Sequence, residues 1–298
     1  MRLRPLLPAA TIAALVVVVA LPLTFVLLEA IFPHLAQGSL AGAASAILPT
    51  LRKPDTLSLI DNTLRLGLAV AIGAALTGGT LGALRGLFRV PCARLWDLMF
   101  LVPFLIPPYL AALAWILLLQ NGGYAKQLTG ISAERFIFSM PGVVCVMTLN
   151  IFPVVYFAVS RAVAANGWHL THVARVHGAG AWRAFARVTL PLALPSFAAS
   201  LLLAFTMAIE EYGVPAAIGT RAGFPVLVTS IESRFADWPI DLSGASILSV
   251  ILAALALCAF VIQHRLLATR DFTTQIGKPA EVSQRPLARW RIPVVASF

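Results

Sequence analysis

The chain has 298 residues, of which 59% are hydrophobic and 11% are charged, and its formal net charge is +10. Soluble domains carry about 25% charged residues, so this composition excludes a water-soluble globular protein and indicates a membrane protein. Cys92, Cys145 and Cys258 form no closely spaced pair, so we expect neither a disulfide nor a cysteine metal site.

Six apolar segments are each long enough to cross the hydrocarbon core of a bilayer as a helix of about 20 residues. They lie at about 8–32, 58–87, 95–119, 139–163, 195–218 and 243–267. Apolar residues occupy all sides of such segments, as expected for helices surrounded by lipid. We therefore predict an all-α, polytopic membrane protein with six transmembrane helices.

The distribution of Lys and Arg predicts the orientation in the membrane. With the N-terminus inside, fifteen of the 22 basic residues lie in the predicted cytoplasmic segments and seven on the other side. By the positive-inside rule, both termini are then cytoplasmic. Because topology accounts for the net charge, we do not expect nucleic-acid binding.

Two patterns in the second and third segments concern helix packing. Gly78, Gly82 and Gly86 repeat every four residues on one helical face, which predicts close approach of a neighbouring backbone. The third segment contains "LVPFLIPPYLAALAW", whose prolines remove backbone N–H donors and predict a kink. Trp96 and Trp115 are nineteen residues apart, so one straight helix would place them at opposite interfaces.

Acidic residues in an apolar segment are candidates for a translocation pathway. Glu210 and Glu211 fall in the outer part of the fifth predicted helix, where an unpaired charge is costly. Neighbouring helix positions point about 100° apart, so we expect at least one glutamate to face a helix interface or an aqueous path. The alternative is a structural role, through snorkelling or through pairing with Arg221 or Arg234 in the next loop.

The stretch "HVARVHGAGAWRAFARVTLPLALP", residues 172–195, interrupts the apolar pattern between the fourth and fifth segments. We expect two short helices joined at Gly178, which form a protruding knob. In the second helix, apolar positions recur every four residues from Trp182, while Arg183 and Arg187 share the opposite face. The apolar face is expected to lie on membrane or protein, and the basic face to meet solvent, lipid phosphate or an acidic partner.

The spacing within this stretch resembles the EAA loop of type I ABC importer permeases. The matching positions are Ala174, Gly178, Val188, Leu190 and Pro191. The acid that opens the family motif is replaced by His172, and the alanine after it by Val173. Three further stretches, "NTLRLGLAVAIGAALTGGTLGAL", "PFLIPPYLAALAW" and "EEYGVPAAIG", are similar to the iron(III) and polyamine branch of that family.

The resemblance implies the type I permease fold and a mechanical function. In this family the loop inserts into a groove on a cytoplasmic ATPase, and a periplasmic solute-binding protein delivers the solute. The implied partners are therefore that ATPase, the binding protein, a second permease half or second copy of the chain, and the lipid of a bacterial inner membrane. Since no Gly-x4-Gly-Lys-[Ser/Thr] stretch is present, ATP binding must come from another subunit. We expect that this chain is not an enzyme and that it needs no cofactor.

Iron(III) is the expected solute, from the similarity of "EEYGVPAAIG", with polyamine and phosphonate as alternatives. A secondary transporter driven by an ion gradient is the competing class, because Asp61 and the two glutamates are available to couple to protons. A metal site is not expected, because His169, His172 and His177 are loosely spaced and no Cys or carboxylate joins them.

Three parts follow from these patterns. Residues 1–57 hold the first transmembrane helix and a periplasmic segment, and residues 58–267 form a core of five helices with the coupling loop at about 165–193. Residues 268–298 form a cytoplasmic linker. It ends in "ARWRIPVVASF", where a basic flank precedes the start of an apolar run, as in the first segment. We interpret this end as the start of a seventh helix, which would make the chain the N-terminal half of a fused permease. Otherwise it pairs with a separate half or with itself.

Overall fold

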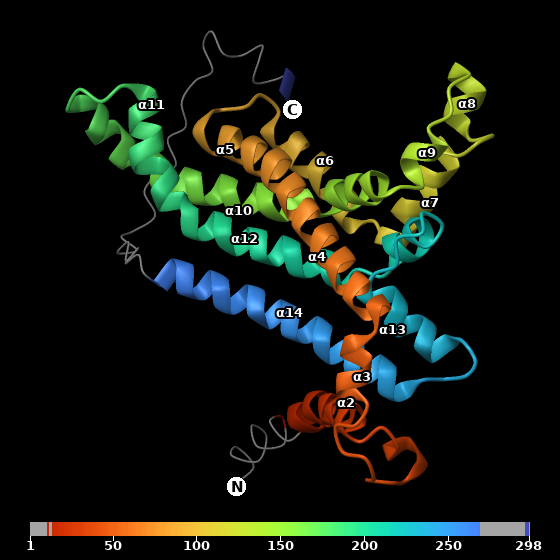
Figure 1. Ribbon diagram of the computed structural model, residues 1–298. Helices are drawn as coiled ribbons and strands as arrows, with labels where there is room; N and C mark the ends of the chain where they lie inside the picture. The colour runs from red at the N-terminus through yellow and green to blue at the C-terminus, as the bar shows by residue number, and fades with distance from the viewer. Residues whose placement is uncertain (1–10, 12–13, 269–295, 298) are drawn as a thin grey trace, which may run out of the picture. The chain divides into compact units, whose positions relative to one another are not determined.

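The computed structural model describes residues 11, 14–268 and 296–297, without the side chains of 166–172, 175, 181 and 266–268. The described residues form helices and connecting turns without an extended strand (Figure 1), which confirms the all-α prediction. Almost all of the predicted linker and its seventh helix lie outside the described residues.

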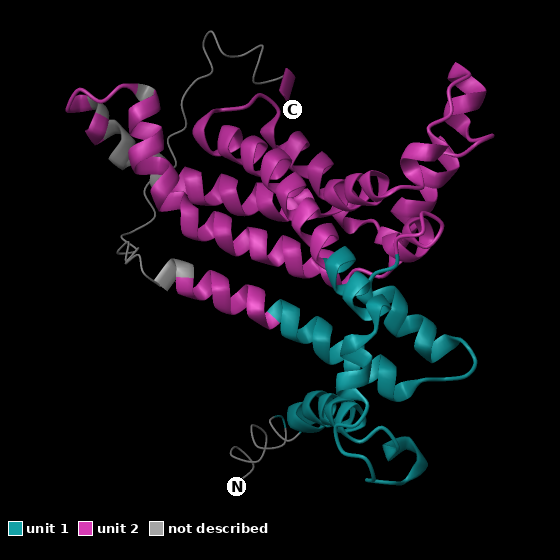
Figure 2. Ribbon diagram, viewed as in Figure 1, with its two compact units in different colours: residues 1–63, 225–256 teal, residues 64–224, 257–298 magenta. Residues whose placement is uncertain are grey.

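The chain divides into two compact units (Figure 2): residues 1–63 with 225–256, and residues 64–224 with 257–298. The elements of the first unit are η1 Val16–Ala20, α2 Leu21–Ile31, η2 Leu35–Gln37, α3 Ile47–Arg52, the start of α4 Pro54–Ala74, α13 Leu227–Ala236 and the start of α14 Leu242–Ala268. Its buried core takes one leucine from each of α4, α13 and α14: Leu59, Leu227 and Leu248. Arg234 pairs with Asp241 at 2.9 Å across the turn between α13 and α14.

The second unit is built around one long helix, α10. Its elements between the ends of α4 and α14 are η3 Ala75–Gly79, α5 Thr80–Leu87, α6 Ala93–Leu105, α7 Pro108–Leu119, α8 Tyr124–Thr129, α9 Glu134–Ile137, α10 Met140–Val176, α11 Ala181–Ala184, η4 Phe185–Thr189, α12 Leu190–Glu210 and η5 Pro215–Gly219. Helix α10 packs along α5 and α12 and also contacts α6, α7 and η4 (Figure 1). Its Tyr156 and Met147 side chains are buried.

The glycine face predicted in the second segment lies against α10, as expected. A Cβ atom added at Gly82 would lie 2.6 Å from the carbonyl oxygen of Tyr156, and one added at Gly86 would lie 2.8 Å from that of Ser160. Since no side chain fits at these positions, the absence of a Cβ allows the two backbones to approach closely. This contact fixes α5 on the central helix.

Four helical segments among the described residues are long and apolar enough to cross a membrane. They are Pro54–Leu87, Met140–Ala165, Trp182–Glu210 and Leu242–Arg265. The bent pair Ala93–Leu105 and Pro108–Thr129 is a fifth if it counts as one span. The described part of the first predicted segment contains a shorter apolar helix, Val16–Ile31. The count of six therefore stays a prediction.

The third predicted segment is not one straight helix, because α6 and α7 meet at a bend of 95°. The predicted kink is confirmed, whereas the placement of Trp96 and Trp115 along one axis is wrong. Pro107 has no N–H to offer the carbonyl of Pro103, four residues earlier. The buried side chain of Asn150 on α10 donates to that carbonyl instead, at 2.6 Å. A hydrogen bond between helices thus replaces the one that the proline removes.

We expect Gly82→Val to separate α5 from α10, because its side chain would overlap the carbonyl oxygen of Tyr156. Overpacking of this kind costs about 1–3 kcal/mol, so the thermal unfolding midpoint of the purified protein in detergent should fall. Gly180→Val is the matched control, since nothing lies within 4 Å of a Cβ at Gly180. Equal midpoints for the two variants would contradict the close approach.

Candidate functional site

The predicted coupling loop is the tip of a helical hairpin (Figure 1). Helix α10 continues beyond the span to Val176, a length of 37 residues. After the turn, a second helical segment runs from Trp182 to Glu210. The expectation of two separate short helices is therefore wrong. Polar residues end a membrane span, but they do not end a helix, because the backbone hydrogen bonds continue through them.

Gly178 makes the turn at the tip of the hairpin, as predicted. Its φ of +86° lies in the left-handed region, which glycine adopts without a Cβ clash. The N–H of Ala179 donates to the carbonyl of Ala174 at 3.0 Å. This is the hydrogen bond of a Schellman cap that spans six residues. The last turn of α10 is thereby closed, and the chain is free to reverse before α11.

The hairpin exposes large apolar side chains next to basic ones. Val176 is 73% exposed and Trp182 is 78% exposed. The ring of Trp182 lies 5.8 Å from that of Phe185, centroid to centroid. Arg183 and Arg187 are also exposed. Exposed apolar side chains beside charged ones are typical of a surface that binds another protein.

The other predicted coupling residues surround this turn. Val173 and Leu190 are exposed, Ala174, Val188 and Pro191 are half-buried, and the side chain of His172 is not among those described. The π-helical segment η4 directly precedes Leu190-Pro191. A π-helical turn is wider than an α-helical one, so it tolerates a proline, which has no backbone N–H to donate. The helix therefore continues through this Leu-Pro pair.

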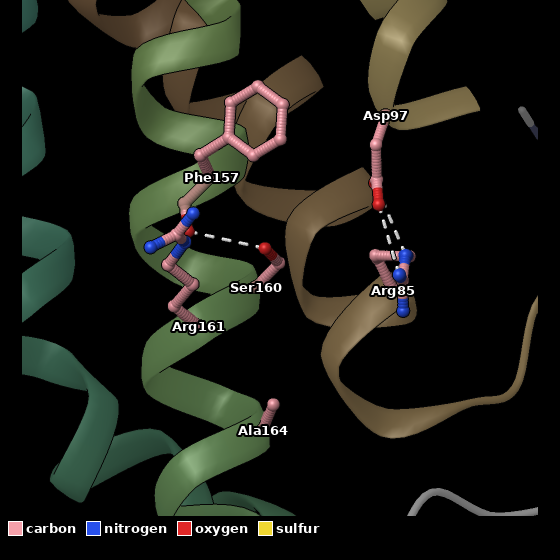
Figure 3. Close-up of a pocket in the computed structure, with 6 residues that line it drawn as sticks. All are labelled: Arg85, Asp97, Phe157, Ser160, Arg161 and Ala164. Carbon is pink, nitrogen blue, oxygen red and sulfur yellow. Dashed lines mark hydrogen bonds and ion pairs between the residues drawn. The ribbon is translucent and has the colours of Figure 1, made fainter. Parts of the chain in front are cut away.

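A polar cluster that the sequence analysis did not identify joins α5, α6 and α10. Arg85 contacts Asp97 through two hydrogen bonds of 3.0 and 3.2 Å (Figure 3). The hydroxyl of Tyr156 donates to the same carboxylate at 2.6 Å. The available signal was Asp97 itself, an acid just inside the third apolar segment, where charge is rare and needs a partner.

A cavity of about 240 Å³ lies beside this cluster. In Figure 3, Arg85 and Asp97 face each other on one side, and Phe157, Ser160 and Arg161 lie on α10. The Ser160 hydroxyl donates to the carbonyl of Phe157 at 3.2 Å. Asp97 on α6 bonds to Arg85 on α5 and to Tyr156 on α10, so the cluster holds α5 and α6 on α10.

Glu210 and Glu211 lie at the far end of α12 from the hairpin. The helix predicted to reach 218 ends at Glu210, which is exposed. Glu211 takes an extended conformation and is half-buried. Its carboxylate accepts a hydrogen bond of 2.7 Å from the N–H of Gly213. This bond fixes the turn that leads into η5.

A larger cavity of about 700 Å³ lies between α7 and the η5 turn. Its polar lining residues are Tyr109, Gln120, Tyr212, Thr220 and Arg221. The guanidinium of Arg221 lies over the ring of Phe138, 5.4 Å from the centroid. Within the described residues, Arg221 forms no ion pair with either glutamate. Arg234 pairs with Asp241 instead. The predicted pairing of a glutamate with either arginine is thus not found among the described residues, whereas snorkelling and the pathway role stay predictions.

Residues 76–270 match the family described as "Binding-protein-dependent transport system inner membrane component". The chain belongs to this family. It is therefore a permease component of an ABC importer, a multi-pass membrane subunit that is not itself an enzyme.

Several curated proteins are similar to this chain. The molybdenum transport system permease protein ModB of Escherichia coli (strain K12) is 28% identical over 178 residues, 59% of this chain and 78% of ModB. The molybdate/tungstate transport system permease protein WtpB of Thermococcus kodakarensis is 27% identical over 235 residues, 78% of this chain and 87% of WtpB. The sulfate transport system permease protein CysT of E. coli (strain K12) is 28% identical over 180 residues, 59% of this chain and 64% of CysT.

A solved structure shares the fold. It is a bacterial ABC transporter involved in the import of the acidic polysaccharide alginate. The TM-score is 0.70 at 17% sequence identity, and the match covers 90% of this chain and 96% of that one. A second structure holds the alginate transporter in complex with its pentasaccharide-bound periplasmic protein, also with a TM-score of 0.70.

We expect Asp97→Asn to destabilise the protein more than Tyr156→Phe. The tyrosine variant loses one hydrogen bond, worth about 1 kcal/mol. The asparagine variant removes the charge that balances Arg85, which costs about 2 kcal/mol for a pair that is partly exposed. Thermal unfolding of the purified protein measures both, and Arg85→Gln with Asp97→Asn should recover part of the loss. A larger effect of Tyr156→Phe would contradict this assignment.

Proposed function

We propose that this chain couples ATP hydrolysis by a separate ATPase to the import of a small oxyanion of the molybdate or sulfate class. Membership in the permease family supports the ATP-driven mechanism. The observation that carries the proposal is the hairpin, whose glycine turn and exposed apolar and basic side chains lie at the family's loop position. The proposed coupling residues are His172, Val173, Ala174, Gly178, Val188, Leu190 and Pro191.

Helix α10 connects the hairpin to the rest of its unit. As one helix of 37 residues it acts as a lever, so displacement of its tip moves the positions along its length. Tyr156 and Asn150 are two of these positions, and both bond to α6. Closure of an ATPase dimer on ATP would push on the tip and rock the spans between inward-open and outward-open states.

The chemistry of the tip suits a groove with an acidic rim. Val176 and Trp182 would enter the groove, because burial removes their apolar surface from water. Arg183 and Arg187 would pair with carboxylates of the ATPase around it. The family's acid would not contribute, because His172 occupies its position.

We infer from the positive-inside distribution that the hairpin lies in the cytoplasm. The far end of the unit, with Glu210, Glu211 and the larger cavity, would then face the periplasm. We propose that this end receives the solute from a periplasmic binding protein and that a second permease half, or a second copy of this chain, completes the path. Residues 58–267 would form the permease core, with the coupling loop at about 165–193.

The proposed solute class follows the relatives. ModB, WtpB and CysT are named for molybdenum, molybdate or tungstate, and sulfate. Molybdate, tungstate and sulfate are oxyanions of similar shape and charge, and alginate is also an acid. Import of iron(III), polyamine or phosphonate is the alternative; the first two are suggested by the similarity of "EEYGVPAAIG" and two further stretches to the iron(III) and polyamine branch.

Uptake by cells that express this chain with its ATPase and binding protein tests the solute class. We expect labelled sulfate or molybdate to accumulate, deletion of the chain to reduce uptake to background, and re-expression to restore it. Unlabelled oxyanion should compete, whereas iron(III) and spermidine should not. A deletion that abolishes iron(III) uptake but leaves both oxyanions unchanged would overturn the proposed class.

Gly178→Val should uncouple transport while the protein still inserts into the membrane. A β-branched residue at a φ of +86° is strained, so the turn would open and the tip would leave its docking position. We expect uptake to fall at least about tenfold, since a loss of about 1.4 kcal/mol in docking already lowers affinity by that factor. Co-purification measures ATPase association.

Gly180→Val serves as the control for this variant. Gly180 lies in the same turn, but a Cβ there meets nothing within 4 Å and needs no left-handed backbone. Normal ATPase association and uptake in Gly178→Val would show that the turn does not position the docking surface.

A further inference from the structure

The cavity at the proposed periplasmic end is lined entirely by residues that the structure describes. One of these residues is charged. Arg221 supplies that charge, and Gln120, Thr220 and Tyr109 contribute neutral hydrogen-bonding groups. The remaining lining is mostly alanine and leucine from α7 and η5. The formal charge of the lining residues is therefore positive, which favours an anion.

The structure holds Arg221 in place without neutralising it. The N–H groups of Ala222 and Phe224 donate to carbonyls of η5 at 3.1 and 2.9 Å, so the turn around Arg221 is closed by backbone hydrogen bonds. Its guanidinium stacks over Phe138. No carboxylate of the described residues forms an ion pair with it. A stacked guanidinium with unpaired N–H groups is suited to bind an oxyanion through two parallel hydrogen bonds.

The turn before η5 brings this arginine's segment close to α7. A Cβ atom at Gly213 would lie 2.9 Å from the Cβ of Tyr109, so only glycine allows this approach. Glu211, an acid at the start of this turn, is not part of the cavity lining. Its carboxylate is occupied by the N–H of Gly213. The same glycine therefore closes the cavity wall and partly satisfies the negative charge that would repel an anion.

We propose that Arg221 is a solute-contacting residue, which binds a tetrahedral oxyanion as it passes through the cavity of about 700 Å³. This proposal rests on the oxyanion class proposed above. The cavity is much larger than one sulfate or molybdate ion, so the ion keeps part of its hydration water there. Weak, partly hydrated binding is suited to a pathway, because the ion must enter and also leave.

Uptake of labelled sulfate and molybdate by the complete complex in cells tests this assignment. We expect Arg221→Gln to lower uptake about tenfold, the loss that corresponds to one charge-assisted hydrogen bond. Arg221→Lys keeps the charge but not the planar fork, so its uptake should lie between those of wild type and Arg221→Gln. Arg135→Gln is the matched control, because Arg135 is an exposed arginine of α9 outside the cavity lining.

ATPase stimulation by the solute-loaded binding protein is measured in parallel and should be retained in Arg221→Gln, since the hairpin is unchanged. Uptake in Arg221→Gln equal to that in Arg135→Gln would overturn the assignment. A wild-type complex that imports neither oxyanion would instead overturn the solute class. If Arg221→Gln does not accumulate in the membrane, Arg221→Lys decides, because full uptake by that variant rules out bidentate contact.

Discussion

The fold of the larger unit depends on the close backbone contact between α5 and α10. Lipid acyl chains are as apolar as the side chains of membrane helices. Helices in a membrane therefore associate through tight packing more than through hydrophobic burial. Gly82 and Gly86 allow that packing, because any Cβ there would overlap the α10 backbone. The central helix is thereby fixed to α5 on one side and packs on α12 on another. It also continues into the hairpin, so helix packing and the proposed coupling share one element.

Two polar groups inside this apolar unit, the carbonyl of Pro103 and the carboxylate of Asp97, are paired between helices. The proline break between α6 and α7 leaves a carbonyl without its helical donor, and Asn150 supplies one. Asp97 is bound by Arg85 and Tyr156 from two different helices. An unpaired polar group in this environment costs several kcal/mol. These bonds therefore specify how the broken helix sits on α10, in addition to any contribution they make to stability.

The sequence predicts the parts of this arrangement that depend on local pattern. Helical spans follow from apolar length, the packing face from the spacing of Gly78, Gly82 and Gly86, and the hairpin turn from Gly178. The family, which was expected from a resemblance around that turn, is confirmed by the match over residues 76–270.

Tertiary partners are not visible in such patterns. The bond from Asn150 to Pro103 and the contacts of Asp97 join residues far apart in the chain. The end of an apolar span also does not predict the end of its helix, because α10 continues past its apolar part to Val176. The stretch "EEYGVPAAIG" does not identify a solute by itself, because it forms a turn and only part of the wall of a cavity that Arg221 and α7 also line.

Site-directed cross-linking between the hairpin and the ATPase subunit tests the lever account most directly. Val176→Cys places a thiol on the exposed last residue of α10, and Leu128→Cys places one on a residue of α8 that is also highly exposed and lies away from the hairpin. In membranes that contain the assembled complex, we predict that a short bifunctional reagent joins Val176→Cys to the ATPase and does not join Leu128→Cys. A cross-link from Leu128→Cys alone, or from neither position while the ATPase stays bound, would contradict the account.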